Sequence, residues 1–417
     1  MSTNSENQIV TFGCRLNIYE SEVIRTRSKE AGLENAIIFN TCSVTAEAER
    51  QARQAIRKAR RDHPGKTIIV TGCAVQINPE RYASMPEVDR VLGNHEKMQT
   101  VSFSPENPQK VLVNDIMSVK ETAVHLVQSF DDNTRAFIEV QNGCDHRCTF
   151  CTIPFGRGNS RSVPMGILFD QVRSLVDKGF TEVILTGVDV TSYGGDLPGN
   201  PTLGQMMRRL LAHVPGLKRL RLSSLDPVEV DPDLFHLIEN EPRLMPHLHI
   251  SLQAGADMIL KRMKRRHLRD DVIKFCKKVR SLRPDVVFGA DIIAGFPTET
   301  EEMFAQTLDL VQTCNLTYLH VFPYSKRPGT PAARMPQVEG PIIKERAKRL
   351  RDLGQIQLTA FLKTQMGTIQ NVLTEKNKRG RAENFAPIAF QENVEPGLLR
   401  RVKITGIADA MLTGEIL

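Results

Sequence analysis

The sequence predicts an α/β protein in three parts: a small amino-terminal parallel α/β domain, a partial (β/α)6 barrel, and a small carboxy-terminal β-barrel. Apolar, strand-like runs alternate with helical stretches up to about residue 360, as expected where crossover helices join parallel strands. Beyond residue 364 the pattern changes to short β-like runs separated by Gly, Asn and Pro. With 417 residues, 41% of them hydrophobic, the chain is long enough for two or three packed domains.

The first domain is expected over residues 5–114. Its strand-like runs cover residues 9–12, 36–39 and 67–71, and a helical stretch covers 45–62. Each run is followed by one cysteine, namely Cys14, Cys42 or Cys73. Ligands gather beyond the carboxyl ends of parallel strands, so we expect these three cysteines to converge. The alternative is three unrelated buried thiols. Three thiolates are one short of the four that hold an ordinary [4Fe–4S] cube, so we infer a cluster with one exposed iron.

The barrel is expected over residues 130–360, after a polar linker at 115–134. Six strand candidates cover residues 136–141, 182–187, 217–223, 247–253, 286–293 and 317–322, with helices between them such as 167–178 and 270–281, and a basic helix at 340–363 closes the barrel. The site of such a fold lies at the carboxyl ends of its strands. Gly187, Asp189, Gln253 and Asp291 end, follow or lie within these strands, so we expect them to reach a ligand there. Turn formation or a structural hydrogen bond remains an alternative for each.

The last segment, residues 364–417, predicts the small β-barrel. Its β-like runs cover residues 368–373, 386–390 and 399–404, and regularly spaced short strands are typical of such barrels. Cys276 and Cys314 lie in apolar stretches, so we expect them in the core.

A second cysteine motif follows the first barrel strand. Cys144, Cys148 and Cys151 stand in the run NGCDHRCTFCTIPFGRG. Three thiolates leave one iron of a cube without a protein ligand, free to bind a small molecule through nitrogen and oxygen. The alternative is a structural zinc site with His146 as a further ligand, but this spacing suits tetrahedral closure poorly.

Basic residues predict a nucleic-acid partner. The net charge is +7, and basic side chains gather at residues 50–61, 261–269, 344–351 and 376–381. Such clusters are typical of phosphate contacts, although charge runs also form solvated helix faces. Tryptophan is absent and tyrosine occurs five times, so backbone contacts should dominate over base stacking.

Several classes are disfavoured. The polar start MSTNSENQIV does not have the pattern of a signal peptide. We find no run of about 18 apolar residues, so we expect no membrane partner. Eight cysteines without a secretory pattern favour metal ligation in a reducing cytoplasm over disulfides.

These motifs together resemble one family, the methylthiotransferases of the radical SAM superfamily. TFGCRLNIYES, NTCSVTAEAERQARQAIRKA and VTGCAVQ are similar to the amino-terminal domain of that family, and NGCDHRCTFCTIPFGRGNSRS is similar to its radical SAM loop. LTGVDVTSYG, PHLHISLQAG and ADIIAGFPTET are similar to its barrel, and the terminal segment to its TRAM domain. FGCRLN with NTCSVTAEAE resembles the MtaB-like branch, which acts on N6-threonylcarbamoyladenosine at position 37 of tRNA.

The resemblance implies a transferase with two [4Fe–4S] clusters and S-adenosylmethionine. The open iron held by Cys144, Cys148 and Cys151 would chelate S-adenosylmethionine and give a 5′-deoxyadenosyl radical, with Phe150 near the adenine. The cluster at Cys14, Cys42 and Cys73 would present the sulfur. The implied partners are the tRNA anticodon stem-loop, an electron donor and a sulfur source.

Three other functions stay open. Neighbouring branches of the family act on isopentenyladenosine in tRNA or on an aspartate of a ribosomal protein. A non-catalytic iron–sulfur RNA-binding protein is a further alternative, but it would not need an open iron.

Two arginines just after the loop motif are candidate substrate ligands. The threonylcarbamoyl group ends in a carboxylate, which the planar fork of arginine matches. Arg157 and Arg161 are well placed for this in the sequence. Alternatively, they bind tRNA phosphate or brace the cluster loop.

Overall fold

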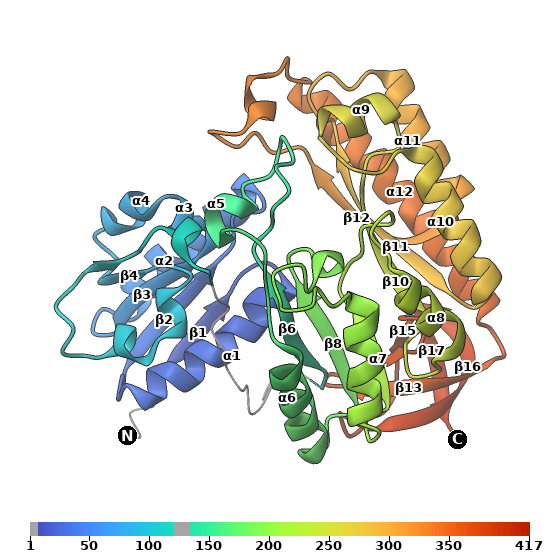
Figure 1. The fold of residues 1–417 in the computed structure, drawn as a ribbon, viewed down its shortest axis with the longest axis horizontal. Helices are drawn as coiled ribbons and strands as arrows, with labels where there is room; N and C mark the ends of the chain where they lie inside the picture. The colour runs from blue at the N-terminus through green and yellow to red at the C-terminus, as the bar shows by residue number, and fades with distance from the viewer. Residues whose placement is uncertain (1–6, 121–133) are drawn as a thin grey trace.

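The computed structural model describes residues 7–120 and 134–417. Three bodies are visible in Figure 1: a parallel sheet with helices in blue, a half-open barrel running from green to orange, and a small β-barrel in red. This architecture confirms the predicted fold class. Residues 1–6 and 121–133, the latter within the expected linker 115–134, lie outside the described residues.

The amino-terminal sheet has five parallel strands in the order β1-β2-β3-β4-β5. They are β1 (Gln8–Thr11), β2 (Ala36–Thr41), β3 (Thr67–Gly72), β4 (Arg90–Leu92) and β5 (Val111–Leu112), and their helices are α1 (Arg15–Glu30), α2 (Ala46–Asp62), α3 (Cys73–Ile77) and α4 (Pro79–Ala83). Alternate residues of β2 pack on opposite faces: Ile37 and Phe39 on one, Ile38 on the other. Both faces are therefore covered, as parallel sheets require.

The barrel consists of two sheets, ordered β7-β6-β8-β9 and β10-β11-β12. Its strands are β6 (Ala136–Asn142), β7 (Arg161–Ser162), β8 (Glu182–Gly187), β9 (Arg219–Leu222), β10 (His247–Gln253), β11 (Val287–Ala294) and β12 (Leu316–Pro323). The six predicted strands correspond to all of these except the antiparallel β7. Isolated bridges at Leu220–Leu244 and Leu225–Ile250 join the two sheets, so the six parallel strands form an open barrel.

The barrel part of the chain contains eight helices within the described residues, of which α5 packs against α3 of the amino-terminal domain. They are α5 (Ile153–Arg157), α6 (Met165–Asp177), α7 (Leu203–His213), α8 (Pro232–Asn240), α9 (Asp257–Arg262), α10 (Arg269–Leu282), α11 (Glu301–Thr313) and α12 (Gly340–Thr364). Short 3₁₀ turns are η1 (Glu96–Met98), η2 (Thr100–Phe103), η3 (Ile116–Ser118), η4 (Val190–Ser192) and η5 (Pro331–Arg334). No helix in the described part of the chain is long and apolar enough to cross a bilayer.

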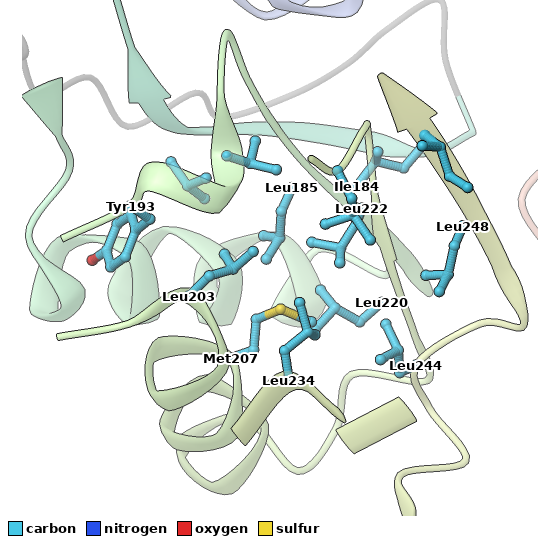
Figure 2. Close-up of a cluster of buried hydrophobic side chains, with 14 of the residues drawn as sticks. Ile184, Leu185, Tyr193, Leu203, Met207, Leu220, Leu222, Leu234, Leu244 and Leu248 are labelled. Atoms are coloured by element: carbon cyan, nitrogen blue, oxygen red, sulfur yellow. The ribbon is translucent and has the colours of Figure 1, made fainter. Parts of the chain in front are cut away.

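The largest hydrophobic core lies between the barrel strands and these helices. Figure 2 shows Leu185 of β8 and Leu222 of β9 packing towards Leu203 and Met207 of α7. Cys276 and Cys314 are buried in the same core, as predicted. Closing this core fixes the carboxyl ends of the strands, where the site lies.

The carboxy-terminal barrel is closed, with strands in the order β13-β14-β15-β17-β16. They are β13 (Ile369–Glu375), β14 (Arg379–Ala382), β15 (Pro387–Ala389), β16 (Leu399–Ala408) and β17 (Met411–Ile416). The sequence analysis expected three of these and missed β14 and β17. Between β14 and β15, Phe385 stacks on His247 of β10, with the ring centroids 4.6 Å apart, and so docks the small barrel on the large one.

Candidate functional site

The first cysteine triad forms at the carboxyl edge of the amino-terminal sheet. Cys14 immediately precedes α1, Cys42 follows β2, and Cys73 begins α3 directly after β3. Glycines permit this convergence. A Cβ on Gly13 would lie 2.5 Å from Cys42 Sγ, and one on Gly72 would lie 2.3 Å from the Thr41 carbonyl oxygen. Both glycines also have positive φ, which L side chains rarely adopt.

The thiols of this triad affect one another electrostatically. Burial raises the pKa of Cys42 to about 12, and the neighbouring Cys14 and Cys73 add to the shift. The Val44 N–H donates to Cys42 Sγ at 3.4 Å, and Asn94 Nδ2 donates to Cys73 Sγ at 3.7 Å. Donors of this kind suit thiolates that ligate a metal. The structure thus brings Cys14, Cys42 and Cys73 close to one another, as expected.

The second triad lies in the loop between β6 and α5. Burial raises the pKa of both Cys144 and Cys151 to about 12. The Arg265 guanidinium donates to Cys148 Sγ at 3.6 Å, and the Ile153 N–H donates to Cys151 Sγ at 3.4 Å. This triad resembles the first in its nearby guanidinium and its backbone donor, but all three of its cysteines are partly buried, whereas in the first triad Cys14 is exposed and Cys42 and Cys73 are buried.

The spacing of the sulfurs fits clusters better than single metal ions. A tetrahedral zinc ion with bonds of about 2.3 Å brings its sulfur ligands to within about 4 Å of each other. Among the described residues, neither cysteine triad forms a group whose ligand atoms all lie within 4.8 Å. Cys144 does form such a group with His146 and Asp189, but this group leaves Cys148 and Cys151 out. Both triads fit [4Fe–4S] clusters with one iron left open.

One cavity of about 670 Å³ connects the two triads. Cys14 and Cys42 line one side of it, and Phe150 and Cys151 line another. The predicted cofactor residues Gly187, Gln253 and Asp291 also line it. Phe150 is fixed edge-to-face against Phe296, with the ring centroids 6.4 Å apart.

Asp189 alone among the predicted cofactor residues is not part of the cavity lining. Its carboxylate lies 2.8 Å from His146 Nε2 and 3.7 Å from the Arg266 guanidinium. Asp189 thus contacts the loop of the second triad through His146, which lies between Cys144 and Cys148. A contact between Asp189 and the cofactor stays a prediction.

A group of polar side chains in the cavity was missed by the sequence analysis. Asp291 Oδ1 lies 2.9 Å from His249 Nε2 and 3.1 Å from His320 Nδ1. Burial opposes ionisation of Asp291, but the hydrogen bonds from the two histidines hold its pKa well below the usual value. The available signal was the period of two in β10, where alternate residues His249, Ser251 and Gln253 all line the cavity.

Arg157 and Arg161 have contacts that favour the bracing alternative. Arg157 donates to Glu20 at 2.8 Å and to Asn17 Oδ1 at 2.7 Å, and Glu20 also binds Lys97 at 2.7 Å. Burial opposes the charge of Arg157, but the nearby thiols and Glu20 raise its pKa well above the usual value. Arg161 donates to the backbone carbonyls of Asn159 and Arg157. Both guanidiniums already have partners, although Arg157 also lines the cavity.

The basic clusters are in large part balanced by acidic neighbours. On α2, Arg50 pairs with Glu47 and Arg60 with Asp89. Arg265 pairs with Asp226, and Arg346 with Glu299. Within the described residues, the side chains of Arg400, Arg401 and Lys403 on β16 are exposed and have no hydrogen-bond or ion-pair partner. The sequence analysis predicted this strand but did not count it among the basic clusters.

Two family models match separate parts of the chain. The radical SAM superfamily matches residues 138–311, and the uncharacterized protein family UPF0004 matches residues 6–93. TsrM, a radical S-adenosylmethionine methyltransferase from Kitasatospora setae solved with cobalamin and a [4Fe-4S] cluster bound, has a similar fold. Its TM-score is 0.55 at 13% identity, over 79% of this chain and 77% of that one. The barrel with its loop triad is thus that of a radical SAM enzyme.

Full-length relatives narrow the class. The threonylcarbamoyladenosine tRNA methylthiotransferase MtaB of Rickettsia prowazekii is 58% identical over 99% of this chain and 98% of its own length. The tRNA-2-methylthio-N(6)-dimethylallyladenosine synthase of Ehrlichia chaffeensis is 33% identical over 90% of this chain and 89% of its own. The chain belongs to the methylthiotransferase family of radical SAM enzymes, in its MtaB-like branch. Its cofactors are accordingly S-adenosylmethionine and [4Fe–4S] clusters, and the zinc alternative is set aside.

Proposed function

We propose that this enzyme transfers a methylthio group to carbon 2 of N6-threonylcarbamoyladenosine at position 37 of tRNA. The observation that carries the proposal is the shared cavity, which has cysteines of both triads in its lining. Bound there, the clusters and S-adenosylmethionine would supply the sulfur, its methyl group and the radical that removes hydrogen from a strong, non-acidic C–H bond. The relative at 58% identity is named for the same substrate.

The side chains around the cavity have separate tasks. Cys144, Cys148 and Cys151 would hold the cluster that binds S-adenosylmethionine, and Phe150, Gly187 and Gln253 would contact that cofactor. Cys14, Cys42 and Cys73 would hold the cluster that presents sulfur. Apolar lining residues such as Ile293 and Phe322 help to exclude water from the radical's path.

We expect the target base to turn out of the anticodon loop and enter the cavity. Position 37 lies in the single-stranded anticodon loop, where a base can leave the stack at low cost. The anticodon stem-loop is therefore the proposed partner, and the exposed Arg400, Arg401 and Lys403 are candidate phosphate contacts. An electron donor and a sulfur source must also serve the enzyme. Because the substrate is tRNA, we propose that it works in the cytoplasm.

Salt dependence tests the phosphate contacts. Changing both Arg400→Gln and Arg401→Gln should weaken tRNA binding and flatten its salt dependence by about one unit of slope per lost contact. Arg50→Gln removes a basic side chain that Glu47 already pairs, so it should leave the slope unchanged. An unchanged slope in the β16 variant would remove that strand from the interface.

Mass spectrometry of tRNA nucleosides tests the substrate. A strain lacking this protein should lose 2-methylthio-N6-threonylcarbamoyladenosine and keep any 2-methylthio-isopentenyladenosine. Loss of the isopentenyl product instead would assign the chain to the neighbouring substrate, while the cluster chemistry would stand. If the tRNA nucleosides were unchanged and a ribosomal protein lost its methylthio group, the chain would belong to the branch that acts on that protein.

A further inference from the structure

Arg15 stands out among the side chains of the cavity. It is the first residue of α1, immediately after the cluster cysteine Cys14, and it lines the cavity. It has no hydrogen-bond or ion-pair partner among the described residues. A cation at a cavity wall without a counter-ion is costly unless something binds it there.

The other basic side chains of the described lining all have acidic partners. Arg157 is held by Glu20. Arg327 is held by Glu49. His249 and His320 share the carboxylate of Asp291. This leaves Arg15 as the one basic group of the described lining that is available to an anionic ligand.

The surroundings of Arg15 reinforce its positive charge. Arg135, Arg221, Asp291 and Arg381 are its electrostatic neighbours, but the Asp291 carboxylate makes its direct contacts to His249 and His320. The guanidinium of Arg15 lies 5.9 Å from the centroid of the Phe385 ring. These neighbouring arginines have acidic partners, although Arg135 and Arg381 share Glu375. Arg135 pairs with Glu375 at 2.9 Å, and Arg221 pairs with Glu182 at 2.8 Å. Phe385 brings no negative charge, so the arginines around its ring form a positively charged region in which Arg15 has no direct ion pair.

We propose that Arg15 binds the carboxylate of the threonylcarbamoyl group and so selects the substrate. This inference rests on the proposed function. On an adenine ring, N1 separates carbon 2 from the carbon that bears N6, so the substituent on N6 lies on the same edge as the reacting carbon. A residue adjacent to Cys14 can therefore touch the substituent while carbon 2 faces the sulfur-presenting cluster. The planar guanidinium offers a carboxylate two parallel hydrogen bonds.

A matched pair of RNAs tests this assignment. Both are anticodon stem-loops with N6-threonylcarbamoyladenosine at position 37, but in the second the terminal carboxylate is replaced by a neutral carboxamide. Binding to the anaerobically reconstituted enzyme should favour the acid by about 10- to 100-fold, the usual effect of a charge-assisted hydrogen bond. Arg15→Gln should lose this preference and bind the carboxamide RNA as the unaltered enzyme does.

Two further variants sharpen the test. Arg15→Lys keeps the charge but not the fork, so its preference for the acid should be intermediate. Arg173→Gln removes an exposed arginine on α6 that pairs with Asp170 and should keep the full preference.

Several results would overturn the assignment. An Arg15→Gln enzyme that still preferred the acid would exclude Arg15 as the carboxylate ligand. Equal loss of binding to both RNAs would indicate a phosphate contact or a structural role instead. The test is independent of the substrate assay: if the unaltered enzyme modifies isopentenyladenosine and not the acid RNA, the proposed function fails, whatever Arg15 binds.

Discussion

The two cysteine triads reach similar surroundings by different routes. Cys144, Cys148 and Cys151 lie in one loop between β6 and α5, so local sequence alone brings them together. Cys14, Cys42 and Cys73 come from three loops that only the parallel pairing of β1, β2 and β3 aligns. The first arrangement can be recognised as a motif. The second depends on strand register and on glycines that let the loops approach, so it should be the more fragile of the two.

Buried polar contacts also connect the loop of the second triad to the helix that follows Cys14. Arg157 of α5 follows the loop triad, yet its guanidinium binds Asn17 and Glu20 of α1, the helix that begins after Cys14. Figure 1 shows α5 beside α3, which begins with Cys73. The buried contacts of Arg157 therefore tie the amino-terminal domain to the barrel, at the point where the cavity connects the two triads.

The largest expected effect breaks one triad and spares the other. In Gly72→Ala, the new Cβ would meet the Thr41 carbonyl oxygen at 2.3 Å, at a φ of +102°. Iron content after reconstitution should fall from about eight to about four per chain, and cleavage of S-adenosylmethionine should persist. Gly65 lies in the same domain, and a Cβ added there would meet no atom within 4 Å, so Gly65→Ala should keep the full iron content. Full iron content in the Gly72 variant would show that Cys14, Cys42 and Cys73 can still hold their cluster with an alanine at position 72.

A smaller effect should follow from breaking the charge link. Glu20→Gln leaves Lys97 and Arg157 buried without their shared carboxylate. Losing one partner of a buried ion pair costs about 3–5 kcal/mol, which urea unfolding would measure as a lower midpoint. Glu47→Gln breaks an exposed, solvent-screened pair on α2, so it should leave the midpoint almost unchanged. Equal midpoints for the two variants would mean that the buried network does not hold the domains together.

The smallest effect concerns the pH dependence of stability. Burial, and then the charge of Glu20, raise the pKa of Glu139 from 4.5 to about 7. The folded protein therefore holds this proton more tightly than the unfolded chain. The stability that Glu139 contributes is fully present below about pH 4.5 and is lost as the pH rises through 7. The glutamine variant mimics the protonated form.

Glu139→Gln should accordingly be more stable than the unaltered protein at pH 8, by ~1–3 kcal/mol, and about equal to it near pH 4. Urea unfolding at the two pH values measures both differences. A glutamine variant that is less stable at pH 8 would mean that the ionised carboxylate is favourably bound in the fold.

Much of the fold followed from patterns that are local in sequence. The strands β2, β3 and β8 contain continuous apolar runs, and the order of strands and helices along the chain predicted both the parallel sheet and the open barrel. Strands β4, β5 and β7 were missed because each has two or three residues, too few to show a period. β14 was missed because its sequence, RGRA, is polar, since only Gly380 and Ala382 turn inwards.

The site was predictable to the same extent. The six cysteines stood out by motif and placement. Gly187 and Gln253 at strand ends and Asp291 within β11 line the cavity, and their contacts with the cofactor stay predictions. The partners of each charge were not. Nothing in the sequence indicates that Arg157 would bind Glu20, far away in the chain, or that Arg15 would be left without an acid. Such pairings depend on how the domains dock.

The separation of roles between the triads is the central claim, and one pair of variants tests it most directly. Cleavage of S-adenosylmethionine and methylthiolation of tRNA would be measured side by side in reconstituted Cys148→Ala and Cys42→Ala enzymes. We predict that Cys148→Ala abolishes both reactions, whereas Cys42→Ala retains cleavage and loses methylthiolation. Methylthiolated tRNA from the Cys42 variant would contradict the claim that this triad presents the sulfur.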